Sequence, residues 1–160
     1  MMTVLWAGVI SDRWFTFSAP PAAVRAALAD TDRYREWWPW LAEFESDGLH
    51  AGARWRCAVR SPLRTMLRFR LLIDRADDHV IAARLVGDLE GQARIWLQPS
   101  SEPEGTELHF EASIQPAGTA IAALTRLMPS VAQWSHDKIV EIAAAQFTEV
   151  LAARVQRTPT

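Results

Sequence analysis

The sequence has a single cysteine, a single lysine and no long hydrophobic run. Cys57 has no second cysteine with which to form an internal disulfide, so nothing points to an oxidising compartment. The apolar segment 4–10 has no preceding basic region and is far shorter than the roughly 20 residues of a membrane-spanning helix. We expect this segment to be a strand or the lead into one, and the protein to be cytoplasmic without membrane insertion.

Composition and charge exclude further classes. Apolar residues make up 49% and charged residues 22% of the 160 positions, which are ordinary globular values and argue against disorder. The net charge of −2 at pH 7 predicts no bulk attraction to nucleic acid or to an anionic membrane. Lys138 is the only lysine among 17 basic residues, a bias that we attribute to codon composition. The length predicts one domain over residues 1–160, with its core over residues 10–154.

Residues 43–114 alternate between apolar and polar side chains, which is the period of a β-strand. In one run, Leu67, Phe69 and Leu71 alternate with Arg68 and Arg70. Turn-forming residues separate the runs, at Gly48, Gly52, Ser61-Pro62, Asp77-Asp78, Gly87 to Gly91 and Pro103 to Gly105. The pattern predicts an antiparallel meander with one apolar face and one charged face.

Helical patterns flank this meander. We expect a first strand over residues 13–18, helices over 20–28, 32–37 and 131–154, and a helix or helical turn over 119–128. Pro20 and Pro21 suit a first helical turn, and Ser130 is the expected N-cap of the long helix. The order predicts an α+β domain, in which a curved antiparallel sheet of about six to seven strands wraps around the long C-terminal helix.

Four short motifs in this order point to a known family. They are Asp-Thr-Asp-Arg-Tyr-Arg-Glu-Trp-Trp-Pro at residues 30–39, Gly-Asp-Leu-Glu-Gly at 87–91, Gly-Thr at 105–106 and Trp-Ser-His-Asp at 134–137. With these motifs the chain resembles the START-like (SRPBCC) helix-grip superfamily over residues 10–152, specifically its polyketide cyclase/dehydrase and lipid-transport branch. The resemblance implies a hydrophobic ligand held between the long helix and the concave sheet. We expect no cofactor. The activities in this superfamily range from ring closure to passive carriage, so the fold does not decide the function.

Three tryptophans, Trp37, Trp38 and Trp40, lie within four positions around Pro39. The proline ends the preceding helix, so the three rings are presented at a helix exit. Two interpretations remain open. The rings form a core plug beneath the short helices, or at least one of them lines the mouth of a cavity with its indole N–H free for a ligand oxygen. Trp38 is the preferred candidate for the second role.

His136 is the most informative polar residue. It precedes Ile139 and Val140 by three and four positions, so it shares their sheet-facing stripe one turn closer to the start of the helix. A histidine there is either a general base or a first-turn residue hydrogen-bonded to a nearby loop. Asp137 points elsewhere and is better explained as a negative charge near the helix N-terminus, so the two do not form a dyad.

The remaining candidates come from the inward rows of the sheet and from the motifs above. Most inward residues are expected to be ordinary core, and a subset near the open end is expected to contact ligand. The candidate ligand-binding residues are Tyr34, Trp37, Trp38, Trp55, Cys57, Phe69, Phe110, Ala112, Trp134 and His136. At Ala112 many relatives carry an aromatic side chain, and the small residue either enlarges the cavity or is covered by a neighbouring ring. No His, Cys, Asp or Glu pair has metal-ligand spacing, so no metal site is expected.

The outward row is expected to be a solvated convex surface. Its arginines share the face with acidic residues, with which they can form weak ion pairs. The arginines are Arg54, Arg56, Arg60, Arg68, Arg70, Arg84 and Arg94, and the acidic residues are Asp74, Glu107 and Glu111. His109 belongs to this face, and Trp96 is a possible dimer contact on it, so we expect a monomer or a weak homodimer.

Three functions are consistent with these features. The preferred one is a carrier or sequestering protein for a hydrophobic, aromatic or polycyclic small molecule. The first alternative is a polyketide aromatase/cyclase and dehydrase, with His136 as acid/base and a Trp N–H or the Tyr34 hydroxyl steadying an enolate oxygen. The second alternative is a protein-interaction module of the same superfamily.

Overall fold

The computed structural model describes residues 8–62, 64–102, 104–117 and 129–157. Its elements are β1 (Val9–Phe17), α1 (Pro21–Ala29), η1 (Thr31–Arg33), α2 (Tyr34–Trp37), β2 (Leu41–Ser46), β3 (Arg54–Arg60), β4 (Met66–Ala76), β5 (Val80–Gly87), β6 (Leu89–Ser101), β7 (Glu104–Pro116) and α4 (Pro129–Arg157). The expected helical segment 119–128, and residues 4–7 of the N-terminal apolar segment, lie outside the described residues. None of the helices described is long and apolar enough to cross a membrane.

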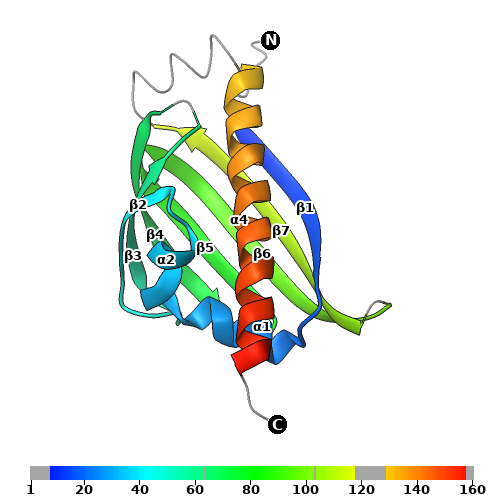
Figure 1. Cartoon of the computed structure of the whole chain (residues 1–160). Helices are drawn as coiled ribbons and strands as arrows, with labels where there is room; N and C mark the ends of the chain where they lie inside the picture. The colour runs from blue at the N-terminus through cyan, green and yellow to red at the C-terminus, as the bar shows by residue number, and fades with distance from the viewer. Residues whose placement is uncertain (1–7, 63, 103, 118–128, 158–160) are drawn as a thin grey trace, which may run out of the picture.

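The seven strands form one antiparallel sheet in the order β1-β7-β6-β5-β4-β3-β2. The meander expected from the period-two pattern is therefore confirmed, and the first strand begins earlier than predicted, at Val9. Register shifts at Leu41/Glu43 and Ile73/Arg75 mark bulges, which add twist to the strands that carry them. The twisted sheet wraps around α4, as the sequence predicts (Figure 1).

The glycine motif at residues 87–91 has a backbone explanation. Gly91 has φ +145°, and a Cβ there would lie 2.0 Å from the carbonyl oxygen of Ser113 on β7. Gly87 has φ +134°, and a Cβ there would lie 2.8 Å from the carbonyl oxygen of Arg68. Both positions therefore need glycine, because L side chains seldom adopt this φ and the neighbouring strands leave no space for one.

The short helices follow the sequence closely. The chain enters α1 through Pro20, and Pro21 occupies its first turn. The predicted second helix appears as η1 and α2, and α2 ends where Trp38 precedes Pro39. The long helix α4 already includes Ser130, so the prediction that this serine caps it from outside is wrong.

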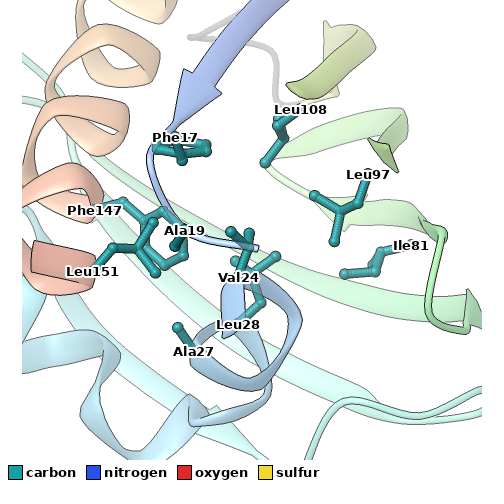
Figure 2. Packing of buried hydrophobic residues seen from close by; sticks show 10 residues of the cluster. All are labelled: Phe17, Ala19, Val24, Ala27, Leu28, Ile81, Leu97, Leu108, Phe147 and Leu151. Atoms are coloured by element: carbon teal, nitrogen blue, oxygen red, sulfur yellow. The ribbon is translucent and has the colours of Figure 1, made fainter. Parts of the chain in front are cut away.

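The C-terminal half of α4 lies over a closed hydrophobic core. Phe147 and Leu151 of α4 pack with residues of β1, α1 and the sheet, and the cluster consists of Phe17, Ala19, Val24, Ala27, Leu28, Ile81, Leu97, Leu108, Phe147 and Leu151 (Figure 2). The rings of Phe17 and Phe147 meet edge to face at 5.3 Å. This half of the helix is held by packing.

The outward face is charged, as expected. Arg56 pairs with Glu45, Arg68 with Glu43 and Arg84 with Asp74, all as exposed ion pairs. Each exposed pair of this kind contributes about 0–1 kcal/mol to the free energy of unfolding, so these residues keep the convex face polar without stabilising the fold much.

Thr106 joins the start of β7 to the chain that leads into α1. Its side chain is fully buried and its hydroxyl donates a 2.6 Å hydrogen bond to the carbonyl oxygen of Ala19.

We expect Thr106→Val to lower the free energy of unfolding by about 1–3 kcal/mol, because the Ala19 carbonyl loses its partner in a site closed to water. Urea unfolding measures the change. Thr16→Val, at an exposed position of β1, is the control and should leave the midpoint close to that of the wild type; an equal effect of both variants would contradict the assignment.

Candidate functional site

The N-terminal half of α4 lies over a cavity of about 260 Å³. The helix contributes Ala132, Ser135, His136 and Ile139 to its wall. The rest of the wall is mostly apolar and comes from the strands and their ends: Val9, Trp40, Val59, Ser61, Thr65, Leu67, Phe69, Leu85, Leu89, Ile114 and Pro116.

The size of the helix side chains explains why this half is hollow. Residues at spacings of three and four lie on one face of a helix, so positions 132, 135, 136 and 139 face the sheet together. Two of these, Ala132 and Ser135, are too short to fill the space above the sheet. Further along the same helix, Phe147 and Leu151 fill it. Close packing therefore ends where the helix changes from large to small residues.

His136 supplies the unusual chemistry of the cavity. Its Nε2 atom is buried and has no hydrogen-bond partner among the described residues. Burial lowers the pKa of the imidazole, Asp137 opposes this shift and Arg13 adds to it, so the ring is neutral at pH 7. The ring lies 6.4 Å from that of Phe110, nearly parallel to it. A buried unpartnered nitrogen is costly, and a ligand group that pairs with it would recover that cost.

The neighbours of His136 are engaged elsewhere. Asp137 accepts a 2.9 Å hydrogen bond from Gln133, as expected for a residue outside any dyad. Gln133 also donates to the carbonyl of Ile10 at 2.9 Å and accepts from its N–H at 3.3 Å, which ties the start of α4 to β1. Arg13 forms an ion pair with Glu141 at 3.5 Å.

Three hydroxyls complete the polar part of the wall. Ser135 comes from α4, and Ser61 and Thr65 come from the turn between β3 and β4. The Ser61 hydroxyl oxygen accepts the N–H of Thr65 at 3.3 Å and its backbone N–H donates to the Thr65 carbonyl at 2.9 Å. Ser61 keeps its own O–H for a further partner, because it acts only as an acceptor in this contact.

The tryptophan cluster is anchored to α4 by its indole nitrogens. Trp38 donates a 3.1 Å hydrogen bond to the carbonyl of Ala143, and Trp40 donates one of 3.1 Å to the side chain of Gln146. The Trp38 N–H is therefore not free for a ligand, contrary to the preference for Trp38 in that role. Trp37 and Trp38 pack against the core of Figure 2 and against a second hydrophobic cluster, which consists of Tyr34, Leu41, Ala53, Trp55, Cys57, Val59, Ile73 and Ala83. The ring that reaches the cavity wall is that of Trp40.

Tyr34 forms the centre of an aromatic group beneath this turn. Its ring contacts those of Trp37, Trp38, Phe44 and Trp55 at centroid distances of 4.7–5.7 Å. Its hydroxyl donates to the carbonyl of Leu28, and burial raises its pKa far above the usual value. The hydroxyl is thus committed to the fold and unavailable to an enolate oxygen.

The second hydrophobic cluster takes up several other candidates. Cys57 and Trp55 belong to it, burial raises the pKa of the Cys57 thiol to about 12, and Trp55 donates a 2.7 Å hydrogen bond to the Gly48 carbonyl. Ala112 is buried between Ser11 and Ala93 of the neighbouring strands.

Of the ten candidate residues, the cavity wall described above contains Phe69 and His136. Phe110 lies beside His136, and Trp134 is 53% exposed. From the sequence, Ser61 was expected only as a turn residue, and no role was expected for Thr65, Ala132 or Ser135. The signal available for Ala132 was its spacing of four from His136, and for Ser135 its spacings of three from Ala132 and four from Ile139, which place these small residues on the sheet-facing side of the helix.

Comparisons with known proteins agree with this architecture. The sequence matches the family model described as polyketide cyclase / dehydrase and lipid transport over residues 12–152. No curated protein matches the sequence.

Three solved structures illustrate the fold. A protein of unknown function, SA2116 from Staphylococcus aureus, has a TM-score of 0.71 at 13% identity, covering 94% of this chain and 97% of that one. A START superfamily protein from Mycobacterium smegmatis has a TM-score of 0.67 at 14% identity, covering 90% and 97%. The di-domain ARO/CYC protein BexL from the BE-7585A biosynthetic pathway has a TM-score of 0.72 at 11% identity, covering 92% of this chain and 51% of BexL. At these identities the similarity shows the helix-grip, START-like fold alone.

The buried His136 makes stability depend on pH. The folded state holds its pKa below the ordinary 6.5, so the unfolded state takes up a proton at a higher pH than the folded state does. We expect the free energy of unfolding to fall as the pH drops below about 6.5, and this part of the fall to vanish in His136→Phe. Urea unfolding at several pH values from 7.5 to 5 measures the difference between the two proteins. The exposed His50, whose pKa is raised by backbone carbonyls, contributes with the opposite sign in both and cancels. An identical slope in both proteins would contradict the burial of His136.

Proposed function

The chain belongs to the polyketide cyclase/dehydrase and lipid transport family, and from this premise we propose that it binds a small, mostly apolar molecule beneath the N-terminal half of α4. The observation that carries the proposal is the pairing of an apolar wall with one buried, unpartnered histidine nitrogen. Pockets for small molecules combine these two properties, because the apolar wall supplies affinity and a few polar groups fix orientation.

The volume of the cavity limits the ligand. At about 260 Å³ it is smaller than the roughly 300–1,000 Å³ of pockets that bind drug-sized molecules. We therefore favour a compact ligand of one or two rings, or a short branched chain, over the polycyclic ligand that the sequence also allowed. Burying about 200 Å² of apolar ligand surface would contribute roughly 5 kcal/mol before the costs of association.

The polar groups of the wall specify one end of this ligand. A hydroxyl or carbonyl oxygen placed next to the His136 Nε2 would remove the unpaired nitrogen that the described residues leave there. The hydroxyls of Ser61, Thr65 and Ser135 line the same cavity and offer further hydrogen bonds. We propose a ligand with one oxygen function on an apolar body.

Filling the cavity from the helix tests this proposal. With 2-naphthol as the probe, we expect Ala132→Phe to weaken binding at least tenfold, because the new ring occupies the cavity. Ala145→Phe adds the same ring at an exposed position of the same helix and is the matched control. Isothermal titration calorimetry measures affinity, and far-UV circular dichroism checks that both variants fold. Equal affinity in Ala132→Phe and the wild type would contradict the cavity as the binding site.

A second candidate function is acid–base catalysis by His136. The neutral ring with an unpartnered nitrogen is the observation that favours it. In this reaction Nε2 would take a proton from the activated methylene of a poly-β-ketone, the carbanion would attack a second carbonyl, and the protonated ring would give that proton to the resulting alkoxide. The ring would then take the second proton from the same carbon and return it to the departing hydroxyl, which leaves as water while the C=C bond forms. The Trp38 N–H and the Tyr34 hydroxyl are already donated to backbone carbonyls, so we assign the stabilisation of the enolate oxygen to the Ser135 hydroxyl.

The two candidates differ in what His136→Phe should change. If the protein is a cyclase, turnover of a linear poly-β-ketone thioester should fall about 100-fold or more, while binding of 2-naphthol changes by about tenfold at most. If the protein is a carrier, the variant changes binding alone. Product analysis by mass spectrometry measures turnover, and wild-type turnover that survives the substitution would contradict a catalytic role for His136.

A further inference from the structure

A stack of three rings stands on the convex face of the sheet, away from the cavity. Trp14 of β1, His109 of β7 and Trp96 of β6 occupy paired positions on neighbouring strands. The His109 ring lies 4.1 Å from that of Trp14 at an interplanar angle of 3°, and 5.0 Å from that of Trp96 at 25°. The imidazole is therefore held in a fixed orientation between two indoles. Trp96, which the sequence offered as a dimer contact, uses its ring in this stack.

Two carboxylates converge on the same imidazole. The Nε2 atom of His109 lies 2.6 Å from Oδ1 of Asp12 and 3.4 Å from Oε1 of Glu111. Asp12 and Glu111 are opposite each other in the β1–β7 register, and each lies two residues from a ring of the stack, on the same face. The ligand atoms of all three side chains lie within 4.8 Å of one another.

Among the described residues, these two carboxylates share one imidazole, and no arginine forms an ion pair with either of them. One ring nitrogen carries at most one proton, so it satisfies one of the two carboxylates at a time. Like charges directly opposite each other on a sheet destabilise it. Arg94 is opposite Glu111 in the β6–β7 register, and no ion pair forms between them. A divalent cation at the common focus of the three side chains would neutralise both carboxylates.

We propose that Asp12, His109 and Glu111 form a binding site for a first-row transition-metal dication of the zinc type. Metal–ligand bonds of about 2.0–2.2 Å in a tetrahedral site place ligand atoms about 3.3–3.6 Å apart. The 3.4 Å between His109 and Glu111 already matches this separation, and a small rotation of the Asp12 side chain would lengthen its 2.6 Å distance to His109 to the same value. One imidazole with two carboxylates selects such a metal over calcium or magnesium, which prefer oxygen ligands alone. Because the site faces solvent, water completes the coordination.

An ion in this site would link the edge strand β1 to its neighbour β7. β1 is an edge strand and supplies one of the three ligands, while β7 supplies the other two. An ion bound to both strands stabilises their pairing, because it binds the folded chain and not the unfolded one. This inference is independent of the ligand proposed for the cavity, since the two sites lie on opposite faces of the sheet.

Calorimetric titration of the full, untagged chain with Zn²⁺ tests the site. We expect one ion per chain and a rise in the melting temperature on adding Zn²⁺. Affinity should fall at least tenfold in Asp12→Asn, in Glu111→Gln and in His109→Phe, which keeps a ring between the indoles. Glu107→Gln, on the same face of β7 but outside the cluster, is the control and should bind as the wild type does. No binding at millimolar Zn²⁺, or equal binding by all variants, would overturn the proposal.

Tryptophan fluorescence locates the ion. Cu²⁺ bound at His109 should quench the emission of the two stacked indoles, and this quenched fraction should disappear in a Trp14→Phe, Trp96→Phe double variant. If the double variant loses none of the quenching, the ion is bound elsewhere, for instance at His50 or His79, and the proposed site is overturned.

Discussion

The position of α4 depends on polar contacts at separate points along the helix, in addition to the packing of its C-terminal half. Near its start, Gln133 exchanges two hydrogen bonds with the backbone of Ile10. In its middle, the indoles of Trp38 and Trp40 donate to Ala143 and Gln146. Near its end, Arg154 forms a 3.1 Å ion pair with Asp30. These contacts fix the distance between helix and sheet, so the segment between the first two ties can span a cavity without collapsing onto it.

The sequence predicts the fold well, because the fold follows from local patterns. The period-two runs predict the sheet, and Pro39 after Trp38 predicts where α2 ends. The functional assignment within the tryptophan turn could not be predicted in the same way. Whether an indole N–H bonds to a ligand or to a helix carbonyl depends on the position of α4 along the sheet. The hydrophobic periodicity of the helix and of the strands is the same for every such position, so it does not predict the contact. Trp38 and Trp40 therefore differ in role although they have the same chemistry and lie two positions apart.

The cluster of Asp12, His109 and Glu111 on the convex face could not be predicted from the sequence for a related reason. Metal sites are found in a sequence when their ligands follow one another at short spacing, as on one turn of a helix or in one loop. Asp12 lies on β1 and His109 on β7, which are the first and last strands along the sequence. They are neighbours only because of the strand order of the folded sheet. In this fold the β1–β7 pair joins the most distant parts of the sheet in sequence, so the side chains brought together there leave no local signal.

The balance between binding and catalysis in the cavity depends on hydrogen-bond donors. A histidine that removes a proton from carbon also needs a second group to hold the negative charge that develops on oxygen. The indoles of Trp38 and Trp40 and the Tyr34 hydroxyl all donate to the protein itself, which leaves Ser61, Thr65 and Ser135 as hydroxyl donors on the wall. A serine hydroxyl rotates freely and costs more to orient than an indole held by packing. The aromatic donors are therefore already hydrogen-bonded within the protein. The cavity wall, with serine and threonine hydroxyls as its donors, is better suited to binding an oxygen-bearing apolar molecule than to stabilising an enolate.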